Sequence, residues 1–187
     1  MRSSVLSTSA SGRTSPAPAL ATRLRPADLL RLTDEGANEV LAGRYDHLLP
    51  ADGVWPAEER WAARLVSDDE VDIWLISWTP GKSTELHDHA GSLGALTVLS
   101  GALTEFRWDG SQLRRRTLAA GDQAAFPIGW VHDVEHAPQP AGLGDPTLSV
   151  HAYSPPLTAM SYYEVTGQGT LRRTHTVLTD QPEGDIR

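Results

Sequence analysis

Residues 81–89 read GKSTELHDH, and residues 121–132 read GDQAAFPIGWVH. The first stretch places His87 and His89 two positions apart, and on an extended strand such positions point to the same face. The second stretch places His132 after a Pro-x-Gly turn, on what reads as another strand. Imidazole nitrogens suit iron, zinc, copper or nickel, whereas magnesium and calcium prefer oxygen ligands. The two stretches therefore predict a metal site with three His ligands.

The two stretches also resemble the paired motifs of the cupin superfamily. An isolated His-x-His is common, but here Gly81, Gly94 and Gly101 bracket it and the Gly-Pro-Gly-His block follows downstream. Those are the spacings of both cupin motifs together. The resemblance implies a mainly β chain that folds as a cupin-type jelly-roll β-barrel.

The remaining pattern agrees with many short antiparallel strands, which favour a sandwich or barrel. Turn signals such as Pro-Gly, Asp-Gly and Gly-Gln-Gly separate the candidate strands. The predicted strands are residues 71–78, 95–100, 102–108, 112–118, 123–127, 130–136, 147–154, 161–165 and 170–178. Ahead of them, residues 26–43 predict two short helices on the outside of the body, with Thr33 as an N-cap.

Length and composition indicate one domain with two tails. A chain of 187 residues suits a single core, and we assign residues 24–178 to one cupin domain. Residues 1–23 are rich in Ser, Ala, Thr and Pro and lack the apolar centre of a secretory signal, so a disordered tail is expected. Residues 179–187 are expected to be a second tail.

Charge and composition exclude several classes of function. The net charge of -8 argues against a nucleic-acid partner, and no apolar run approaches the roughly 18–20 residues of a membrane span. The absence of cysteine excludes disulfides, thiolate ligands and a cysteine nucleophile. We expect a cytoplasmic protein, either a monomer or a small homo-oligomer.

The first motif lacks the Glu that most cupins use as a fourth ligand, since Leu93 and Gly94 occupy its positions. Three neutral imidazoles would leave the charge of a divalent metal uncompensated. Such a metal favours an anionic ligand atom, particularly a soft thiolate.

A third stretch, residues 147–154 (TLSVHAYS), places Ser149, His151 and Tyr153 at alternate positions. On a strand they share one face and can form a chain of hydroxyl, imidazole and phenol groups. A polar stripe with this period could equally be a solvated strand face. The Ser154–Pro155 bond that follows is a candidate for a cis peptide.

With these three motifs the chain resembles the thiol dioxygenases, specifically the bacterial cysteine dioxygenases, from about residue 60 to 165. The resemblance implies ferrous iron, Fe(2+), held by three His, and L-cysteine and O2 as partners that yield cysteine sulfinic acid. Carried over, the iron ligands are His87, His89 and His132, and the catalytic relay is Ser149, His151 and Tyr153.

Three further positions are compared with the family. Gly94 falls where animal members carry a cysteine cross-linked to the tyrosine, so that cross-link cannot form here. Met160, where animal members have another cysteine near the pocket, is expected to be an apolar wall of the substrate site. His136 replaces the Asn that ends the second cupin motif, with an effect that the sequence leaves open.

The family's substrate-carboxylate Arg has two candidates. Arg64 fits the local pattern, although Ala62 then replaces the family's Tyr, and Arg60 is the alternative on total spacing to His87. A guanidinium can bind a carboxylate through two parallel hydrogen bonds.

Two other functions remain open on the sequence alone. The chain could oxidise another small thiol such as 3-mercaptopropionate, which keeps the carboxylate but lacks the amine. It could also be a non-enzymic metal-binding cupin, which would need the three His but no relay on one strand face.

Overall fold

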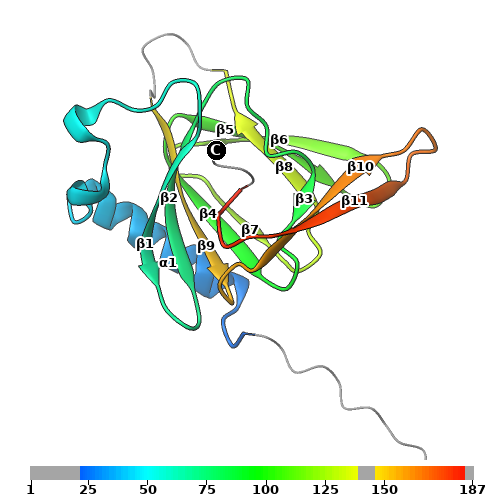
Figure 1. Ribbon diagram of the computed structural model, residues 1–187, viewed down its shortest axis with the longest axis horizontal. Coiled ribbons are helices and arrows are strands. Elements are labelled where there is room, and N and C mark those ends of the chain that lie inside the picture. Colours follow the sequence, from blue (N-terminus) through cyan, green and yellow to red (C-terminus); the bar gives the residue numbers. More distant parts are fainter. Residues whose placement is uncertain (1–21, 139–145, 184–187) are drawn as a thin grey trace, which may run out of the picture.

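In the computed structural model, which describes residues 22–138 and 146–183, eleven strands form two antiparallel sheets that face each other (Figure 1). The five-stranded sheet has the order β1-β2-β9-β4-β7, and the six-stranded sheet has the order β11-β10-β3-β8-β5-β6. This arrangement confirms the prediction of a mainly β jelly roll. The bounds are β1 Trp61–Ser67, β2 Asp72–Trp78, β3 His87–Asp88, β4 Leu93–Ser100, β5 Ala102–Trp108, β6 Leu113–Ala119, β7 Gln123–Phe126, β8 His132–His136, β9 Thr147–Ser154, β10 Ala159–Val165 and β11 Leu171–Leu178.

Each of the nine strands predicted from the sequence corresponds to a strand of the structure, with small differences at the ends. The two that the sequence did not reveal are β1 and β3. Most of β1 is half-buried along its length, so it lacks the alternation that marks a strand, and it lies at the edge of its sheet beside β2. β3 has only two residues, too few to carry any period.

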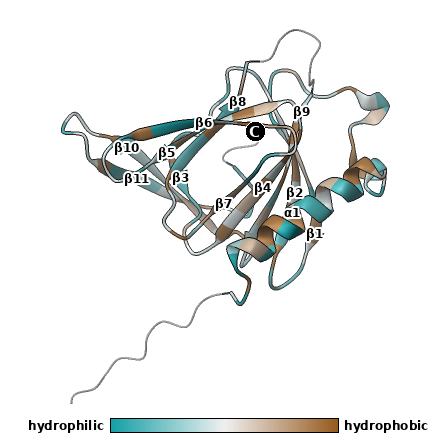
Figure 2. Cartoon of the chain, turned by 180° about the vertical axis from the view of Figure 1, so that it is seen from behind, coloured by the Kyte–Doolittle hydropathy of each residue, from teal (hydrophilic) through white to brown (hydrophobic). Residues whose placement is uncertain are grey.

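The central strands of the five-stranded sheet are buried on both faces. In β2, Trp74, Ile76 and Trp78 face the core between the sheets, while Ile73 and Leu75 belong to a second core. The second core lies under the helix α1 (Pro26–Leu41), which crosses the outside of this sheet (Figure 2). In β9, Leu148, Val150 and Ala152 belong to that second core, so the alternate residues of β9 point between the sheets.

α1 is one continuous helix, so the prediction of two short helices is wrong, as is Thr33 as an N-cap. Its N-cap is Arg25, whose backbone N–H donates to the Asp28 carboxylate at 2.9 Å, and a proline begins the helix. Thr33 lies in the middle of the helix and is buried. Its hydroxyl donates to the Leu30 carbonyl at 3.0 Å and accepts from the Thr97 hydroxyl at 2.8 Å. Those bonds satisfy the hydroxyl inside the helix.

Two short 3-10 turns, Asp46–Leu48 and Ala51–Gly53, connect α1 to β1. The Ser154–Pro155 peptide bond is cis, as predicted. Across the described ranges, no helix combines the length and the apolar character that crossing a membrane requires. The predicted tail at residues 1–23 lies almost entirely outside the described residues.

The chain after β11 does not lead away from the body. It turns back toward the space between the two sheets (the red segment in Figure 1), where Pro182 and Glu183 are buried. Residues 179–183, which we call the C-terminal segment, are therefore part of the folded domain, and the prediction of a tail from residue 179 is wrong for them.

Candidate metal centre

The register of the six-stranded sheet brings the three predicted His ligands together. His87 on β3 lies directly opposite His132 on β8 in the antiparallel pairing, and His89 follows β3 by one residue. The ring centroids are 4.8 Å apart for His87 and His132, 5.1 Å for His87 and His89, and 5.3 Å for His89 and His132. All three rings are buried.

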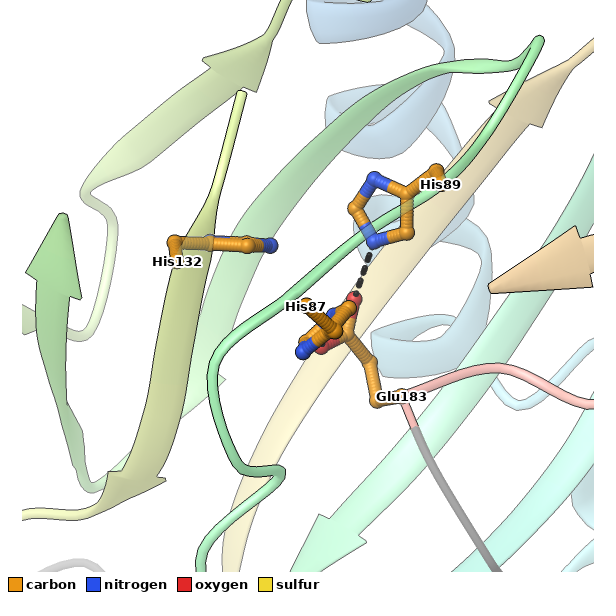
Figure 3. Close-up of side chains that lie close together, drawn as sticks. All are labelled: His87, His89, His132 and Glu183. Carbon is orange, nitrogen blue, oxygen red and sulfur yellow. Dashed lines mark hydrogen bonds and ion pairs between the residues drawn. The ribbon is translucent and has the colours of Figure 1, made fainter. Parts of the chain in front are cut away.

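A fourth possible ligand, a carboxylate, enters the same space from the C-terminal segment. The Glu183 carboxylate points between the imidazoles (Figure 3), and the ligand atoms of His87, His89, His132 and Glu183 all lie within 4.8 Å of one another. Glu183 Oε1 lies 3.3 Å from His89 Nε2, and Oε2 lies 3.4 Å from His87 Nε2. The expectation of a site without a carboxylate is therefore wrong. The Glu missing from the first cupin motif has a counterpart about ninety residues later in the chain.

Hydrogen bonds fix which ring nitrogens face the centre. His87 Nδ1 lies 2.8 Å from the Glu85 carbonyl oxygen, which can only accept, so this nitrogen carries the hydrogen. Glu85 adopts a positive φ of 60°, an uncommon conformation for a residue with a side chain, in the turn that presents this carbonyl. His87 Nε2 is then left with its lone pair toward the other ligands.

Glu105 on β5 orients His132 in the same way. His132 Nδ1 donates to Glu105 Oε1 at 3.1 Å, Trp130 Nε1 donates to the same oxygen at 3.1 Å, and Arg116 pairs with the other oxygen. Burial opposes the charge on Glu105, but these partners outweigh it and lower the pKa of Glu105 to about 2. A charged carboxylate behind the ring holds the hydrogen on Nδ1 and raises the basicity of Nε2.

Whether a metal ion fits this site depends on the atoms whose lone pairs face its centre. His87 Nε2, His132 Nε2 and Glu183 Oε2 are all buried and have no hydrogen-bond partner among the described residues. Buried polar atoms in proteins are almost always satisfied, and two acceptors 3.4 Å apart repel unless a proton or a metal ion lies between them. The donor set therefore fits a divalent transition metal.

The electrostatics of the metal-free cluster agree with that interpretation. Burial lowers the pKa of His89 to about 4 and also lowers the pKa of His132, so both rings are neutral at pH 7. Burial likewise opposes a charge on His87, but the Glu183 carboxylate outweighs it and raises the pKa of His87. Burial alone would raise the pKa of Glu183, whereas its hydrogen bonds to the surrounding imidazoles lower that pKa well below its usual range. The Glu183 charge thus attracts a cation, which is either a proton on His87 or a metal ion among the ligands.

The predicted stripe on β9 points into this interior and is not a solvated face. Ser149, His151 and Tyr153 are all fully buried. Trp78 Nε1 donates to Ser149 Oγ at 2.7 Å, and Ser149 Oγ lies 2.9 Å from His151 Nε2. His151 Nδ1 lies 3.2 Å from the Tyr153 hydroxyl, which donates to Glu183 Oε1 at 2.6 Å.

The two ends set the direction of this hydrogen-bonded chain, because the Trp78 indole N–H can only donate and the Tyr153 hydroxyl donates its own hydrogen to Glu183. Ser149 therefore accepts from Trp78 and donates to His151, whose Nδ1–H in turn donates to Tyr153. Every donor then points toward Glu183 and the metal centre. Burial, and then the neighbouring Glu183 carboxylate, raises the pKa of Tyr153 well above its usual value, so the phenol keeps its proton.

The two candidate arginines have different surroundings. Arg64 is on β1 with its side chain 31% exposed, and its Nη2 donates to the Asp180 carboxylate at 2.9 Å and to the Asp180 carbonyl at 3.2 Å. Arg60, immediately before β1, is 9% exposed, and its guanidinium lies 5.5 Å from the centre of the Trp78 ring. Its Nη1 is buried without a hydrogen-bond partner among the described residues. Burial lowers the pKa of Arg60, and Glu183 acts on it in the opposite sense.

The remaining predicted positions lie around the centre. Met160 is fully buried on β10, in the same apolar cluster as Tyr153. Gly94 pairs with Tyr153 on the neighbouring strand, and a Cβ there would lie 3.0 Å from the Phe126 ring and 3.2 Å from His89 Nδ1. The close approach of His89 thus favours glycine at this position. His136, at the end of β8, is half-buried with an unpartnered Nε2.

A buried cluster of metal-ligating side chains between the two sheets of a jelly roll defines a cupin-type metal protein. A family model described as cysteine dioxygenase type I matches residues 56–166, more than half of the chain. The chain therefore belongs to the cysteine dioxygenase type I family, as the sequence motifs indicated.

Solved structures with a similar fold come from several bacteria. An uncharacterized protein with a double-stranded β-helix domain from Klebsiella pneumoniae is 20% identical with a TM-score of 0.45, covering 65% of this chain and 90% of its own. KdgF from Halomonas sp. is 16% identical with a TM-score of 0.45, covering 55% and 85%. A cupin superfamily protein from Desulfitobacterium hafniense is 16% identical with a TM-score of 0.42, covering 57% and 93%.

Sequence reasoning missed three residues of this centre. Glu105 lies in a strand that reads as an ordinary alternating segment, and only the pairing of β5 with β8 brings it behind His132. Trp78 lies in a predicted strand, but its role as the first donor depends on the pairing of β2 with β9. Glu183 has no local signal at all, because it lies beyond the last strand among polar residues.

Replacing Glu105 with Gln should weaken metal binding by about 10–100-fold, the usual effect of removing a carboxylate behind a metal-bound imidazole. Gln keeps the size of the side chain but removes the charge that holds the hydrogen on His132 Nδ1. Titration of the metal-free protein with Co(II), followed by isothermal calorimetry, measures the change. Glu164→Gln, an exposed carboxylate paired with Arg172 on β11, is the matched control and should bind Co(II) normally. Equal affinities in the two variants would contradict the orienting role of Glu105.

Proposed function

We propose that this protein is an iron(II)-dependent thiol dioxygenase that converts L-cysteine and O2 to cysteine sulfinic acid. Family membership and the buried cluster of possible metal ligands support a metal-dependent dioxygenase. The observation that carries the finer proposal is the one-directional chain from Trp78 to Tyr153, which delivers a neutral phenol to the edge of the metal centre. A protein that only stores or senses a metal has no use for such a chain.

Each protein group then has a defined part. His87, His89 and His132 would hold the iron, which supplies Lewis acidity toward the thiolate and a site for O2. Both atoms of O2 enter the product, since a thiol plus O2 has the composition of a sulfinic acid, so no external reductant is required. The Tyr153 phenol, polarised through His151 and Ser149, donates a hydrogen bond to an anionic group beside the metal.

Arg60 is the better candidate for binding the substrate carboxylate, which reverses the preference drawn from local sequence. An unpaired buried cation is costly unless an anion joins it. Within the described part of the chain, Arg60 Nη1 has no hydrogen-bond partner, whereas Arg64 Nη2 already binds Asp180. The Arg60 guanidinium lies 5.5 Å from the centre of the Trp78 ring, whose N–H begins the hydrogen-bonded chain to Tyr153, and this supports the assignment. Met160 would contribute an apolar wall.

The proposal is tested by loading the protein with Fe(2+) under anaerobic conditions and measuring oxygen uptake with L-cysteine, 3-mercaptopropionate and cysteamine. L-cysteine should be oxidised fastest, with one sulfinate formed for each O2 consumed. The His132→Ala protein is the control and should neither retain iron nor consume oxygen. Faster oxidation of 3-mercaptopropionate would reassign the substrate, and no uptake with any thiol would refute a thiol dioxygenase.

Replacing Tyr153 with Phe should lower kcat by about 10–100-fold, in the range of a positioned acid–base group. The Phe ring keeps the packing in the core, so the thermal unfolding midpoint should stay within a few degrees of the parent. Stopped-flow or electrode measurements of oxygen uptake, beside calorimetric melting, separate the two effects. An unchanged kcat would remove Tyr153 from the chemistry.

Replacing Arg60 with Ala should abolish most of the preference for cysteine over cysteamine, which lacks the carboxylate. A lost charge-assisted pair is worth about 1.5–3 kcal/mol, or roughly 10–150-fold in kcat/KM. Arg64→Ala is the matched variant, and it should change the ratio of the two kcat/KM values much less than Arg60→Ala does. The opposite pattern would return the role to Arg64.

A further inference from the structure

The Glu183 carboxylate makes direct contacts with nearly every group that the proposed reaction uses. It accepts the Tyr153 hydroxyl bond at 2.6 Å, and the same oxygen lies 3.3 Å from both His89 Nε2 and His151 Nδ1. Its other oxygen faces His87 Nε2 at 3.4 Å without a hydrogen bond. The side chain has no solvent exposure. This carboxylate therefore occupies the centre of the site and is not a surface group near it.

The C-terminal segment is held in place by contacts outside the metal centre. The Thr179 backbone N–H donates to the Thr158 carbonyl at 3.1 Å. Arg64 then binds both the carboxylate and the carbonyl of Asp180, and this guanidinium also lies 4.4 Å from the centre of the Trp74 ring. Pro182 is buried just before Glu183. Arg64 thus holds in place the segment that carries the Glu183 carboxylate.

Two separations within the cluster, from the Glu183 oxygens to His89 and to His87, are those expected of ligands to one metal ion. Two atoms each about 2.0–2.1 Å from a tetrahedral ion lie about 3.4 Å apart. The distances of 3.3 and 3.4 Å from the Glu183 oxygens to the two imidazole nitrogens match that value. The carboxylate can therefore share a metal with the imidazoles without any large movement.

The same carboxylate occupies the surroundings that a substrate would need. The Tyr153 hydroxyl already donates to it. Arg60, whose Nη1 has no partner among the described residues, lies over the Trp78 ring at the other end of the same hydrogen-bonded chain. A small thiol carrying a carboxylate cannot use the phenol, the metal and the guanidinium fully while Glu183 remains there. One of the two carboxylates has to leave.

We propose that Glu183 is a resident and exchangeable ligand of the metal, which the C-terminal segment holds in the substrate's position and which the substrate must displace. The identity of the displacing molecule rests on the proposed function, whereas the exchange itself does not. Only molecules in which the carboxylate has moved out can bind the substrate. The apparent affinity for the substrate is therefore reduced in proportion to that fraction. A charge-assisted contact of this kind corresponds to about a 10–100-fold loss of apparent affinity.

The test uses the full chain loaded with Co(II) under anaerobic conditions and titrated with azide, then with L-cysteine, while the visible cobalt spectrum is recorded. Glu183→Gln keeps the shape of the side chain but removes its charge, so both probes should bind about 10–100-fold more tightly than to the parent. Arg64→Ala removes the contacts with Asp180 that hold the C-terminal segment, so it should also tighten azide binding, by a smaller factor. Glu164→Gln is the control for loss of an exposed carboxylate and should behave as the parent.

Two results would overturn the proposal. Azide affinity that is unchanged in Glu183→Gln, at equal cobalt content, would mean that the carboxylate does not occupy an exchangeable position. Weaker Co(II) binding with no gain for azide or cysteine would make Glu183 a permanent ligand. Because both readouts are recorded without oxygen and without turnover, they remain decisive even if the iron-loaded protein oxidises no thiol, a result that would refute the proposed function alone.

Discussion

This centre depends on one constraint, which is that lone pairs of buried atoms point toward one another. The Glu85 carbonyl and the Glu105 carboxylate each hold a hydrogen on the outer nitrogen of an imidazole, so the inner nitrogens have none to offer. Glu183 adds a further acceptor to the same space. Such an arrangement is unfavourable without a cation, and a metal ion bound there would turn the opposed lone pairs into ligand bonds. The surrounding strands place possible ligands on several sides of that position.

In the five-stranded sheet, the two faces of the same strands make different kinds of contact. On β9, the residues that face α1 are apolar, and Gly36 of the helix approaches Val150 so closely that a Cβ there would lie 3.1 Å from it. The alternate residues carry the hydroxyl, imidazole and phenol groups of the hydrogen-bonded chain. Apolar packing on one face therefore fixes the backbone that aligns polar groups on the other, and the chain of donors needs no solvent to complete it.

The extent to which this structure could be read from the sequence follows from the range of the interactions involved. The period of two along β9 and the His-x-His spacing are local, so the strand, its polar face and the ligand pair were all predictable. His132 was predictable because the second motif carries its own turn. Glu105 and Glu183 act through pairings and a returning segment that link distant parts of the chain, which leave no mark on the residues beside them. The sequence could not separate Arg60 from Arg64 for a related reason, since the two residues differ in burial and in an ion pair with Asp180.

A carboxylate tethered to the fold also changes how the site responds to the solutes around it. A covalently attached ligand competes at an effective concentration on the order of millimolar, whatever the bulk solution contains. A simple anion that binds through one atom has to exceed that threshold before it reaches the metal. A molecule that offers a thiolate and a carboxylate together replaces two contacts at once and gains the chelate advantage that the tethered group itself enjoys. With the C-terminal segment in this position, the number of groups through which a solute can bind would decide whether it reaches the metal, more than its charge would.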